Sequence, residues 1–338
     1  MTEALLRVRD LRTYFVTERG GGTARAVDGV SFELHAGETL GLVGESGCGK
    51  TVTSLSLLRL VHEPPGHILP GSVIELEGRN LLALAPRELR AVRGNEIAMI
   101  FQEPMTSLNP VFTIGDQIAE VAIVHQRLSR GAARARAIDL LKLVGIPDPE
   151  VRVDHYPHQL SGGMRQRAMI AMALVCRPKV LIADEPTTAL DVTIQAQILE
   201  LLDRLQAELD MAVLLITHDL GVVAGTVDRV LVMYAGQLVE TAPTAELFAH
   251  PLHPYTQGLL ASVPRLDTPR RRLHSIAGQV PPATAWPSGC RFHPRCAYAW
   301  DRCATEEPPL LDAGTGEPAS HGVRCWLLAE PHRRTPRP

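Results

Sequence analysis

Apolar residues along the chain gather in short runs that end in polar residues, which is the pattern of a buried strand leading into a loop. One run, LGLV at 40–43, is followed by a glycine-rich turn and an amphipathic helical pattern. Two others, VLIA at 180–183 and AVLLIT at 212–217, end in the pairs DE and HD. Such strands predict an α/β fold with a parallel sheet, whose ligand crevice lies at the carboxyl ends of the strands.

No apolar run is long enough to span a bilayer, because the longest candidates, such as MIAMALVC at 169–176, stop at charge or proline. The N-terminus lacks a signal-peptide pattern, and we expect a cytosolic protein whose thiols stay reduced. The 338 residues give room for one large domain and an appendage. The net charge of -3 disfavours a dedicated nucleic-acid binder, which would present a basic face.

The glycine-rich turn fits G-x-x-x-x-G-K-[ST], the phosphate-binding loop. It consists of Gly44, Glu45, Ser46, Gly47, Cys48, Gly49, Lys50 and Thr51. Its glycines allow successive backbone N–H groups to turn inward around phosphate oxygens, and the following helix directs its positive end at the same anion. Lys50 supplies a cation for the β- and γ-phosphates of a nucleotide, and the Thr51 hydroxyl suits Mg²⁺. The strand before and the helix after disfavour the alternative, a turn that binds nothing.

Polar residues at the ends of other strands can complete the nucleotide site. Asp184 can hold Mg²⁺ through water, and Glu185 can polarise the attacking water or accept its proton. His218 follows the next strand and is expected to reach the γ-phosphate, while Gln102 follows a further apolar strand. We predict Glu185, His218 and Gln102 as catalytic residues, and Thr51, Gln102 and Asp184 as the magnesium site.

A long helical pattern begins at Ser161. A serine followed by Gly162 and Gly163 is typical of an N-capped helix start with an exposed anion-binding end. With the other motifs in this order, the chain resembles the ATP-binding subunits of ABC transporters. The resemblance implies that LSGGMRQR is the signature motif, which closes over ATP held by a second subunit. It further implies a Q-loop glutamine at Gln102, a switch histidine at His218, a D-loop aspartate at Asp191, and an adenine-stacking aromatic at Phe15 or Tyr14.

The resemblance covers residues 4–262 and implies the family's architecture. We expect a P-loop ABC ATPase domain over residues 1–262, with a RecA-like parallel-sheet core, an antiparallel β subdomain and a helical subdomain at about 103–175. Residues 263–338 are expected to form a small, irregular, cysteine-rich extension. One departure from the family is Cys48, where serine is common, and this leaves a redox-sensitive role open.

Two stretches, at 250–267 and 276–296, resemble the C-terminal region of oligopeptide and dipeptide permease ATPases. This resemblance implies an importer subunit that hydrolyses ATP at the cytoplasmic face of the membrane to energise uptake of di- or oligopeptides. The implied partners are a second, similar ATPase subunit in a heterodimer, two transmembrane permease subunits contacted through 104–118, and an extracytoplasmic substrate-binding protein. No nucleic acid is expected as a partner. The alternatives are a related importer of nickel or another small solute, and a soluble nucleotide-switched regulator or nucleic-acid factor.

Four of the six cysteines lie near the C-terminus: Cys290, Cys296, Cys303 and Cys325. Thiols clustered in a Pro-, Gly- and Arg-rich segment favour a fold held by a bound metal, since disulfides are rare in the cytosol. Their spacing matches neither common zinc ribbons nor ferredoxins, and the residues alone leave Zn²⁺ and an iron–sulfur cluster both open. The resemblance to the peptide-permease branch implies a 4Fe–4S cluster held by these cysteines.

Overall fold

The computed structural model describes residues 3–17, 22–102, 107–188, 190–263, 276–314 and 321–334. The chain divides into two compact units, each assembled from separate segments. The first unit comprises Met1–Leu6, Leu34–Glu38 and Asn80–Ile216, and the second comprises Arg7–Glu33, Thr39–Arg79 and Thr217–Pro338. Within the described part of the chain, no helix has both the length and the apolar character needed to cross a bilayer.

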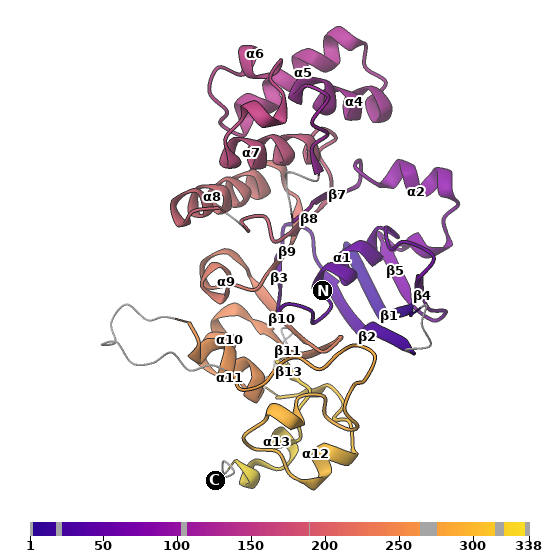
Figure 1. Ribbon diagram of the computed structural model, residues 1–338, viewed down its shortest axis with the longest axis vertical. Helices are drawn as coiled ribbons and strands as arrows, with labels where there is room; N and C mark the ends of the chain where they lie inside the picture. Colours follow the sequence, from indigo (N-terminus) through magenta and orange to yellow (C-terminus); the bar gives the residue numbers. More distant parts are fainter. Residues whose placement is uncertain are drawn as a thin grey trace. The chain divides into compact units, whose positions relative to one another are not determined.

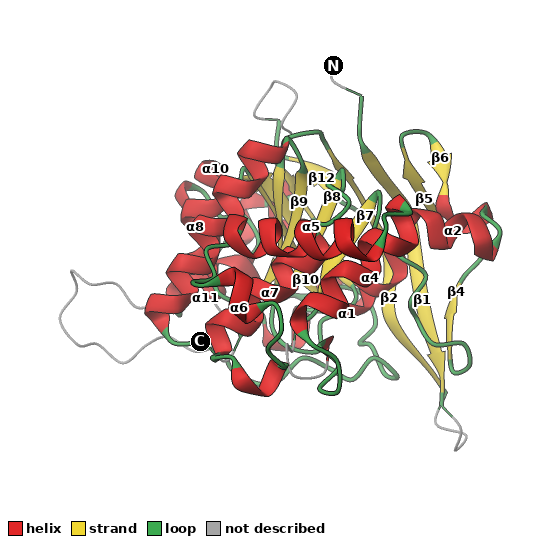
Figure 2. Ribbon diagram, turned by 90° about the horizontal axis from the view of Figure 1, so that it is seen from above, coloured by secondary structure: helices red, strands yellow, loops and turns green. Residues whose placement is uncertain are grey.

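Parallel strands in the order β9, β8, β7 form the sheet of the first unit (Figure 2). They span Ile97–Ile100 (β7), Val180–Asp184 (β8) and Ala212–Thr217 (β9). Every residue of β8 and β9 is buried, as expected for strands covered on both faces. The register pairs Asp184 with Ile216, so the carboxyl ends of these strands meet at one edge. The predicted α/β fold with a parallel sheet is confirmed.

Helices make up most of the rest of the first unit. The helices α4 (Ile114–Gln126), α5 (Arg130–Leu143) and α7 (Gly162–Ala173) pack against one another, and α6 (Pro149–Arg152) adjoins α5 (Figure 1). These helices lie within the range expected for the helical subdomain. The amphipathic α8 (Val192–Leu209) buries an apolar stripe made of Ile198, Leu201, Leu202 and Leu205. Shorter elements are η1 (Leu81–Ala83), α2 (Pro86–Val92) and η2 (Pro157–Gln159).

A first sheet in the second unit has the strand order β2, β1, β5, β6, with β4 paired antiparallel to β1. The strands span Leu6–Val16 (β1), Thr23–Leu34 (β2), Gly66–Ile68 (β4), Val73–Leu76 (β5) and Arg79–Asn80 (β6). Buried and more exposed residues alternate along much of β1 and β2, because only one face of each strand packs into the interior. The phosphate-loop helix α1 (Lys50–Leu57) belongs to the same unit.

The other strands of the second unit follow the order β12, β13, β11, β10, β3. They span Thr39–Val43 (β3), Arg229–Tyr234 (β10), Gln237–Pro243 (β11), Leu311–Asp312 (β12) and Gly322–Val323 (β13). β3 and β10 are parallel, whereas β11 and β13 are antiparallel, with Glu240 opposite Val323. The C-terminal strands β12 and β13 therefore extend the sheet that contains β3. The domain boundary between 262 and 263 stays a prediction.

Short helices complete the second unit. They are α9 (Leu220–Thr226), α10 (Thr244–Ala249), α11 (Pro254–Ala261), η3 (His293–Arg295), α12 (Asp301–Thr305), α13 (Trp326–Ala329) and η4 (Pro331–Arg333). The C-terminal part has a small apolar cluster of its own, in which Val323, Cys325 and Leu327 pack with Leu252, Tyr298, Trp300 and Leu328.

Candidate functional site

The phosphate loop joins β3 to α1 in the second unit. Its glycines at 44, 47 and 49 all have positive φ, the region that favours glycine. A Cβ atom on Gly44 would lie 2.2 Å from the carbonyl oxygen of Met233, so a side chain does not fit there. The Nζ atom of Lys50 reaches back over the loop and donates to the carbonyl oxygens of Gly44 (2.7 Å) and Glu45 (3.2 Å). The loop is thus held in the compact turn that phosphate binding requires.

An open pocket lies beside the loop. It is lined by Gly44, Glu45, Ser46, His218, Leu259, Gly278, Gln279 and Val280. His218 directly follows β9 and is exposed, and the structure places it at the phosphate loop. The last three lining residues come from the C-terminal part of the chain, and no motif or periodicity in the sequence marks them as part of a nucleotide pocket.

Two other members of the loop have distinct environments. Cys48 is completely buried, and this burial raises the pKa of its thiol. A buried thiol with a raised pKa carries little thiolate and reacts poorly, which argues against the redox-sensitive role left open by the sequence. Thr51, the second residue of α1, is exposed, and its contact with magnesium stays a prediction.

The structure brings two predicted catalytic residues of the first unit together. Nε2 of Gln102 donates to Oε2 of Glu185 at 3.0 Å, and Oγ1 of Thr188 donates to the same oxygen at 2.9 Å. Glu185 has a φ of 46°, a conformation that is strained for a residue other than glycine and that recurs at functional sites. Asp184, the last residue of β8, is 1% exposed. The two adjacent acids at a strand end therefore have the placement expected for magnesium and water ligands.

The predicted signature lies at the start of α7. Ser161 is the N-cap of this helix, and its Oγ accepts a hydrogen bond from the backbone N–H of Met164 at 3.3 Å. Gly162 and Gly163 are the first two residues of the helix. A Cβ atom on Gly163 would lie 2.9 Å from Cγ2 of Ile194, so the glycine permits close packing against α8. The cap keeps the positive end of α7 well formed, as an anion-binding helix start requires.

The predicted D-loop aspartate caps a helix. Asp191 is the N-cap of α8, and its Oδ1 accepts a hydrogen bond from the N–H of Ile194 at 3.0 Å. The neighbouring D-loop residue Ala189 lies outside the described residues. A direct contact of Asp191 with nucleotide stays a prediction.

The two adenine-stacking candidates are neighbours on β1, so their side chains point to opposite faces of the strand. The Tyr14 hydroxyl donates to Oδ1 of Asp28 at 2.6 Å, and burial together with this bond raises the pKa of Tyr14 to about 12. Phe15 lies opposite Gly66 on β4 and is partly buried. Stacking of Phe15 on adenine stays a prediction.

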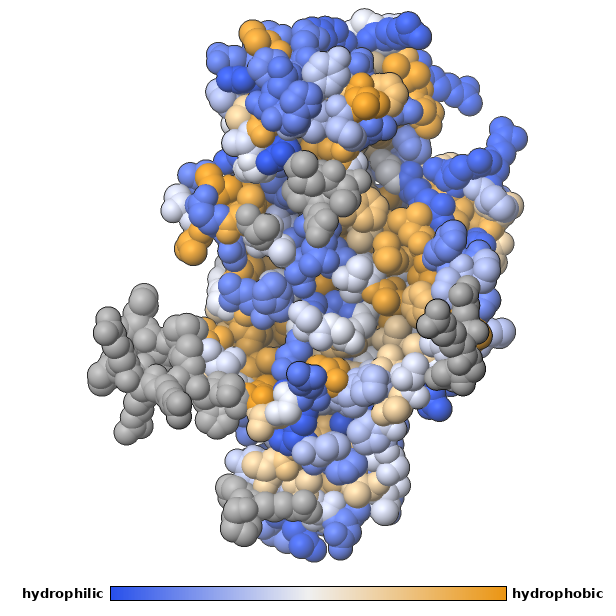
Figure 3. Space-filling model, in the orientation of Figure 1, coloured by the Kyte–Doolittle hydropathy of each residue, from blue (hydrophilic) through white to orange (hydrophobic). Residues whose placement is uncertain are grey.

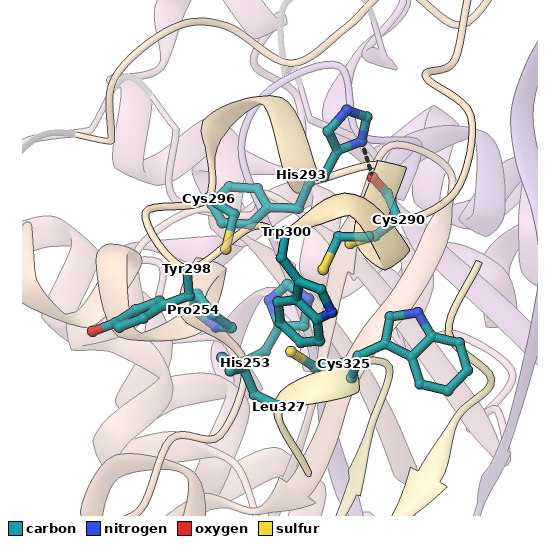
Figure 4. Close-up of a pocket in the computed structure, with 12 residues that line it drawn as sticks. His253, Pro254, Cys290, His293, Cys296, Tyr298, Trp300, Cys325 and Leu327 are labelled. Carbon is teal, nitrogen blue, oxygen red and sulfur yellow. Dashed lines mark hydrogen bonds between the residues drawn. The ribbon is translucent and has the colours of Figure 1, made fainter. Parts of the chain in front are cut away.

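The four C-terminal cysteines line a common pocket in the second unit, together with aromatic residues and His253. Figure 4 shows the sulfur atoms of Cys290, Cys296 and Cys325 pointing into this pocket, which Trp300 also enters. The backbone N–H of Cys290 donates to the carbonyl oxygen of Cys303 at 2.8 Å and holds these two cysteines together. None of the chain's six cysteines, all of which are described, forms a disulfide.

The chemistry of this pocket is that of buried thiols. Burial raises the pKa of Cys290 and of Cys325 to about 12, so both thiols are protonated at neutral pH and metal binding would release their protons. Within the described part of the chain, no group of three or more His, Cys, Asp or Glu side chains is arranged to hold a metal ion. Four thiols are a donor set that a soft metal ion would take, and binding of a metal by these cysteines stays a prediction.

A glycine-lined phosphate loop, paired acids at the end of a buried strand and a second capped helix start define an ATPase of the ATP-binding-cassette class. Residues 27–188 match the ABC transporter family, and residues 239–303 match the oligopeptide/dipeptide transporter C-terminal region. The chain belongs to the ABC transporter ATP-binding proteins, in their oligopeptide and dipeptide branch.

Relatives over nearly the whole length support this membership. The oligopeptide transport ATP-binding protein AppD of Bacillus subtilis is 53% identical over 326 residues, which are 96% of this chain and 97% of that protein. The dipeptide transport ATP-binding protein DppD of the same organism is 50% identical over 325 residues, covering 96% and 95% of the two chains.

Solved structures agree in fold. A dimeric ATP-binding cassette in a post-hydrolysis state, bound to ADP and phosphate, is 26% identical and superimposes with a TM-score of 0.62 over 71% of this chain and 98% of that one. An ABC transporter component from Clostridium perfringens is 28% identical, with a TM-score of 0.60 over 73% and 92% of the two chains.

Proposed function

We propose that this chain is the ATP-hydrolysing subunit of an importer for di- and oligopeptides, bound to the cytoplasmic face of the cell membrane. The observation that carries the proposal is that one chain joins a nucleotide-binding cassette to the C-terminal region of peptide transporters. Relatives at 50–53% identity that are named for oligopeptide or dipeptide transport support the choice of substrate.

In the proposed reaction, the phosphate loop binds the triphosphate of ATP. Lys50 and the inward-facing N–H groups neutralise the phosphates, and Thr51, Gln102 and Asp184 would hold Mg²⁺. Glu185 acts as the base for the attacking water, with Gln102 orienting its carboxylate at 3.0 Å. His218 stabilises the γ-phosphate from the phosphate-loop pocket. Phe15 stacks on the adenine.

The second half of each ATP site is supplied by another cassette. We place Ser161, Gly162, Gly163 and Asp191 of this chain against the nucleotide held by a partner ATPase subunit. A solved cassette of the same fold forms a dimer, which supports pairing. Peptide importers commonly pair two different ATPase subunits, so a heterodimer is proposed over a homodimer. ATP binding closes the pair, and hydrolysis at Glu185 reopens it.

The remaining partners are two transmembrane permease subunits and an extracytoplasmic substrate-binding protein. The proposed permease contact is the segment 104–118, of which residues 107–118 are described. Val111 and Phe112 there are 71% and 52% exposed, and as neighbours they present adjoining apolar side chains, the kind of surface that a partner can cover. Val124 on α4 is also exposed, and Figure 3 shows hydrophobic patches on the surface of the helical cluster. No nucleic acid takes part.

We further propose that Cys290, Cys296, Cys303 and Cys325 hold a 4Fe–4S cluster in the extension at 263–338. Support comes from four thiols that line one pocket together with aromatic side chains, because Cys₄ ligation is the usual cluster set. A single zinc ion bound by the same thiols is the alternative. The cluster would add the stabilisation that the small apolar core of this part lacks.

The test is purification of the chain with its native membrane partners, followed by reconstitution into lipid vesicles that contain the binding protein. Labelled di- and oligopeptides are expected to accumulate only when Mg-ATP is present on the side of the ATPase. Accumulation of nickel without peptide would assign the chain to another solute. Recovery of the chain without any hydrophobic subunit would instead support a soluble regulator.

A further inference from the structure

Arg295 stands between two of the clustered cysteines, at the end of η3, and its side chain is only 5% exposed. Its guanidinium makes a two-point ion pair with the carboxylate of Glu45. Nη1 donates to Oε2 at 2.6 Å, and Nη2 donates to Oε1 at 3.0 Å. Two parallel N–H···O bonds fix a carboxylate in both distance and orientation. Because Glu45 is the second residue of the phosphate loop, the cysteine-bearing segment is attached to that loop.

The same guanidinium also binds the backbone next to another segment that lines the nucleotide pocket. Its Nε donates to the carbonyl oxygen of Ala277 at 2.9 Å, and Nη2 donates to that of Ile276 at 3.4 Å. The residues that follow, 278–280, line the pocket beside the phosphate loop. Arg295 thus joins the phosphate loop to the segment that faces it.

Aromatic rings keep the guanidinium in place. Its Cζ lies 5.7 Å from the ring centroid of Tyr234 and 5.9 Å from that of Phe292. The ring of Tyr255 packs against both, at 4.7 and 5.4 Å between centroids. The Tyr255 hydroxyl also accepts the backbone N–H of Glu45 at 2.8 Å. Both the backbone and the side chain of Glu45 are therefore held by the C-terminal part of the chain.

The ion pair also changes the net charge beside the phosphate loop. Glu45 places a negative charge next to the loop that receives the triphosphate, and its side chain is 31% exposed. Without a positive partner, this carboxylate would repel the phosphates at short range, where water screens only part of the interaction. Arg295 neutralises the carboxylate and still leaves Lys50 to bind the nucleotide.

We propose that Arg295 is a positioning residue for the nucleotide site. It holds the phosphate loop and the segment 276–280 together and cancels the charge of Glu45 beside the triphosphate. The inference rests on ATP binding by the cassette, and it does not depend on which metal the cysteines hold.

The test uses the full-length chain with Arg295→Ala and Arg295→Lys. Equilibrium binding of a fluorescent ATP analogue with Mg²⁺ gives Kd, and hydrolysis over a range of ATP concentrations gives KM and kcat. We expect Arg295→Ala to raise Kd and KM by about ten- to hundredfold, with a smaller change in kcat. Arg295→Lys keeps the positive charge but cannot form the two parallel hydrogen bonds of a guanidinium. Its Kd should therefore lie between those of the wild type and Arg295→Ala.

A second substitution separates the electrostatic effect of Arg295 from its effect on the structure of the loop. In Arg295→Ala combined with Glu45→Gln, the repelling carboxylate is gone, and part of the lost affinity should return. Added salt should reduce the defect of Arg295→Ala for the same reason, because it screens the carboxylate. A purely structural role for Arg295 would produce neither effect.

Arg291→Ala is the matched control, because Arg291 is an equally buried arginine of the same segment that pairs with Asp28 on β2. It should lower thermal stability while leaving Kd within about threefold of wild type. The inference is overturned if Arg295→Ala binds within about twofold of wild type, or if Arg291→Ala weakens binding equally. If Arg295→Ala does not fold, unchanged affinity in Arg295→Lys and in Glu45→Gln overturns it. A wild-type chain that binds no ATP would contradict the nucleotide site itself.

Discussion

Gln102 donates a hydrogen bond from its side-chain Nε2 to Oε2 of Glu185 at 3.0 Å, although the two residues are 83 positions apart in the sequence. The same carboxylate oxygen accepts the hydroxyl of Thr188 at 2.9 Å. The two hydrogen bonds fix the direction of the carboxylate. A general base for water must be held in such a fixed orientation.

Glu185→Gln should therefore abolish turnover and leave ATP binding intact. The amide keeps the shape of the side chain but accepts no proton, and we expect kcat to fall by about 10²- to 10⁴-fold. Phosphate release under saturating ATP and binding of a fluorescent ATP analogue check the two halves of this prediction. Glu200→Gln, at an exposed position of α8, is the control and should hydrolyse ATP like wild type. Unchanged turnover in Glu185→Gln would remove Glu185 from its assigned role.

Phe112→Asp should detach the subunit from its permease. Phe112 is 52% exposed, so a charged side chain there costs the isolated subunit little stability, whereas it would bury a charge in the proposed contact. Co-purification with the permease subunits measures the effect, and nucleotide binding by the isolated chain should be preserved. Val151→Asp, at a similarly exposed apolar residue of α6, should co-purify normally. Equal recovery of permease with both variants would argue against a contact through 104–118.

Serine at any one of the four clustered cysteines should reduce the bound iron and inorganic sulfide per chain. The hydroxyl is a poorer ligand for iron than a thiolate, and the local fold depends on the ligated metal. Anaerobic purification followed by iron, sulfide and zinc analysis is the measurement. Cys48 and Cys176 lie outside the cysteine pocket, so Cys48→Ser and Cys176→Ser should keep the iron and sulfide content of the wild type. Stoichiometric zinc without iron would assign the site to zinc.

Cys48 should be slow to react with thiol reagents in the folded protein. It is fully buried, and burial raises the pKa of its thiol, so both access and thiolate are lacking. Mass spectrometry after a timed exposure to iodoacetamide can compare it with Cys176, which is only partly buried. Rapid labelling of Cys48 without loss of fold would restore the redox-sensitive alternative.

Asp28 should make the second unit sensitive to acid. Burial acts to raise the pKa of this carboxyl, but the hydrogen bonds from Tyr14 and Arg291 and the charge of Arg291 outweigh it, and the pKa is lowered from 3.8. A carboxyl with a lowered pKa in the fold stabilises it above the unfolded pKa, and this contribution is lost as pH falls through the folded value. Thermal unfolding should therefore become easier below about pH 4.

Asp28→Asn checks this assignment, because the amide does not ionise and leaves Arg291 without its partner. It should lower the free energy of unfolding at pH 7 by roughly 3 kcal/mol and flatten the acid-side loss of stability. Asp154→Asn is the control, since Asp154 forms an exposed ion pair with Arg134 and should change stability little. If the stability of Asp28→Asn falls with decreasing pH in the same way as that of the wild type, the role assigned to Asp28 is wrong.

Local features of the chain could be predicted from the sequence, because their physics is local. The apolar runs of β8 and β9 determine strands that are buried on both faces. Glycines in the phosphate loop mark backbone conformations that other residues avoid. The cap at Ser161 needs only a hydroxyl within reach of an N–H three residues ahead, a contact set by helix geometry.

Contacts between distant segments were decided only by the tertiary structure. Glu45 and Arg295 are 250 positions apart, and neither belongs to a pattern that links the tail to the phosphate loop. Segment 278–280 likewise lines the nucleotide pocket without a sequence signal. By itself, the sequence determined the phosphate loop, the acidic strand end and the four thiols, because each depends on residue type and short spacing. The fold alone determined that Arg295 pairs with Glu45 and that the four thiols line one pocket, because long-range packing depends on all the residues that lie between the contacting segments.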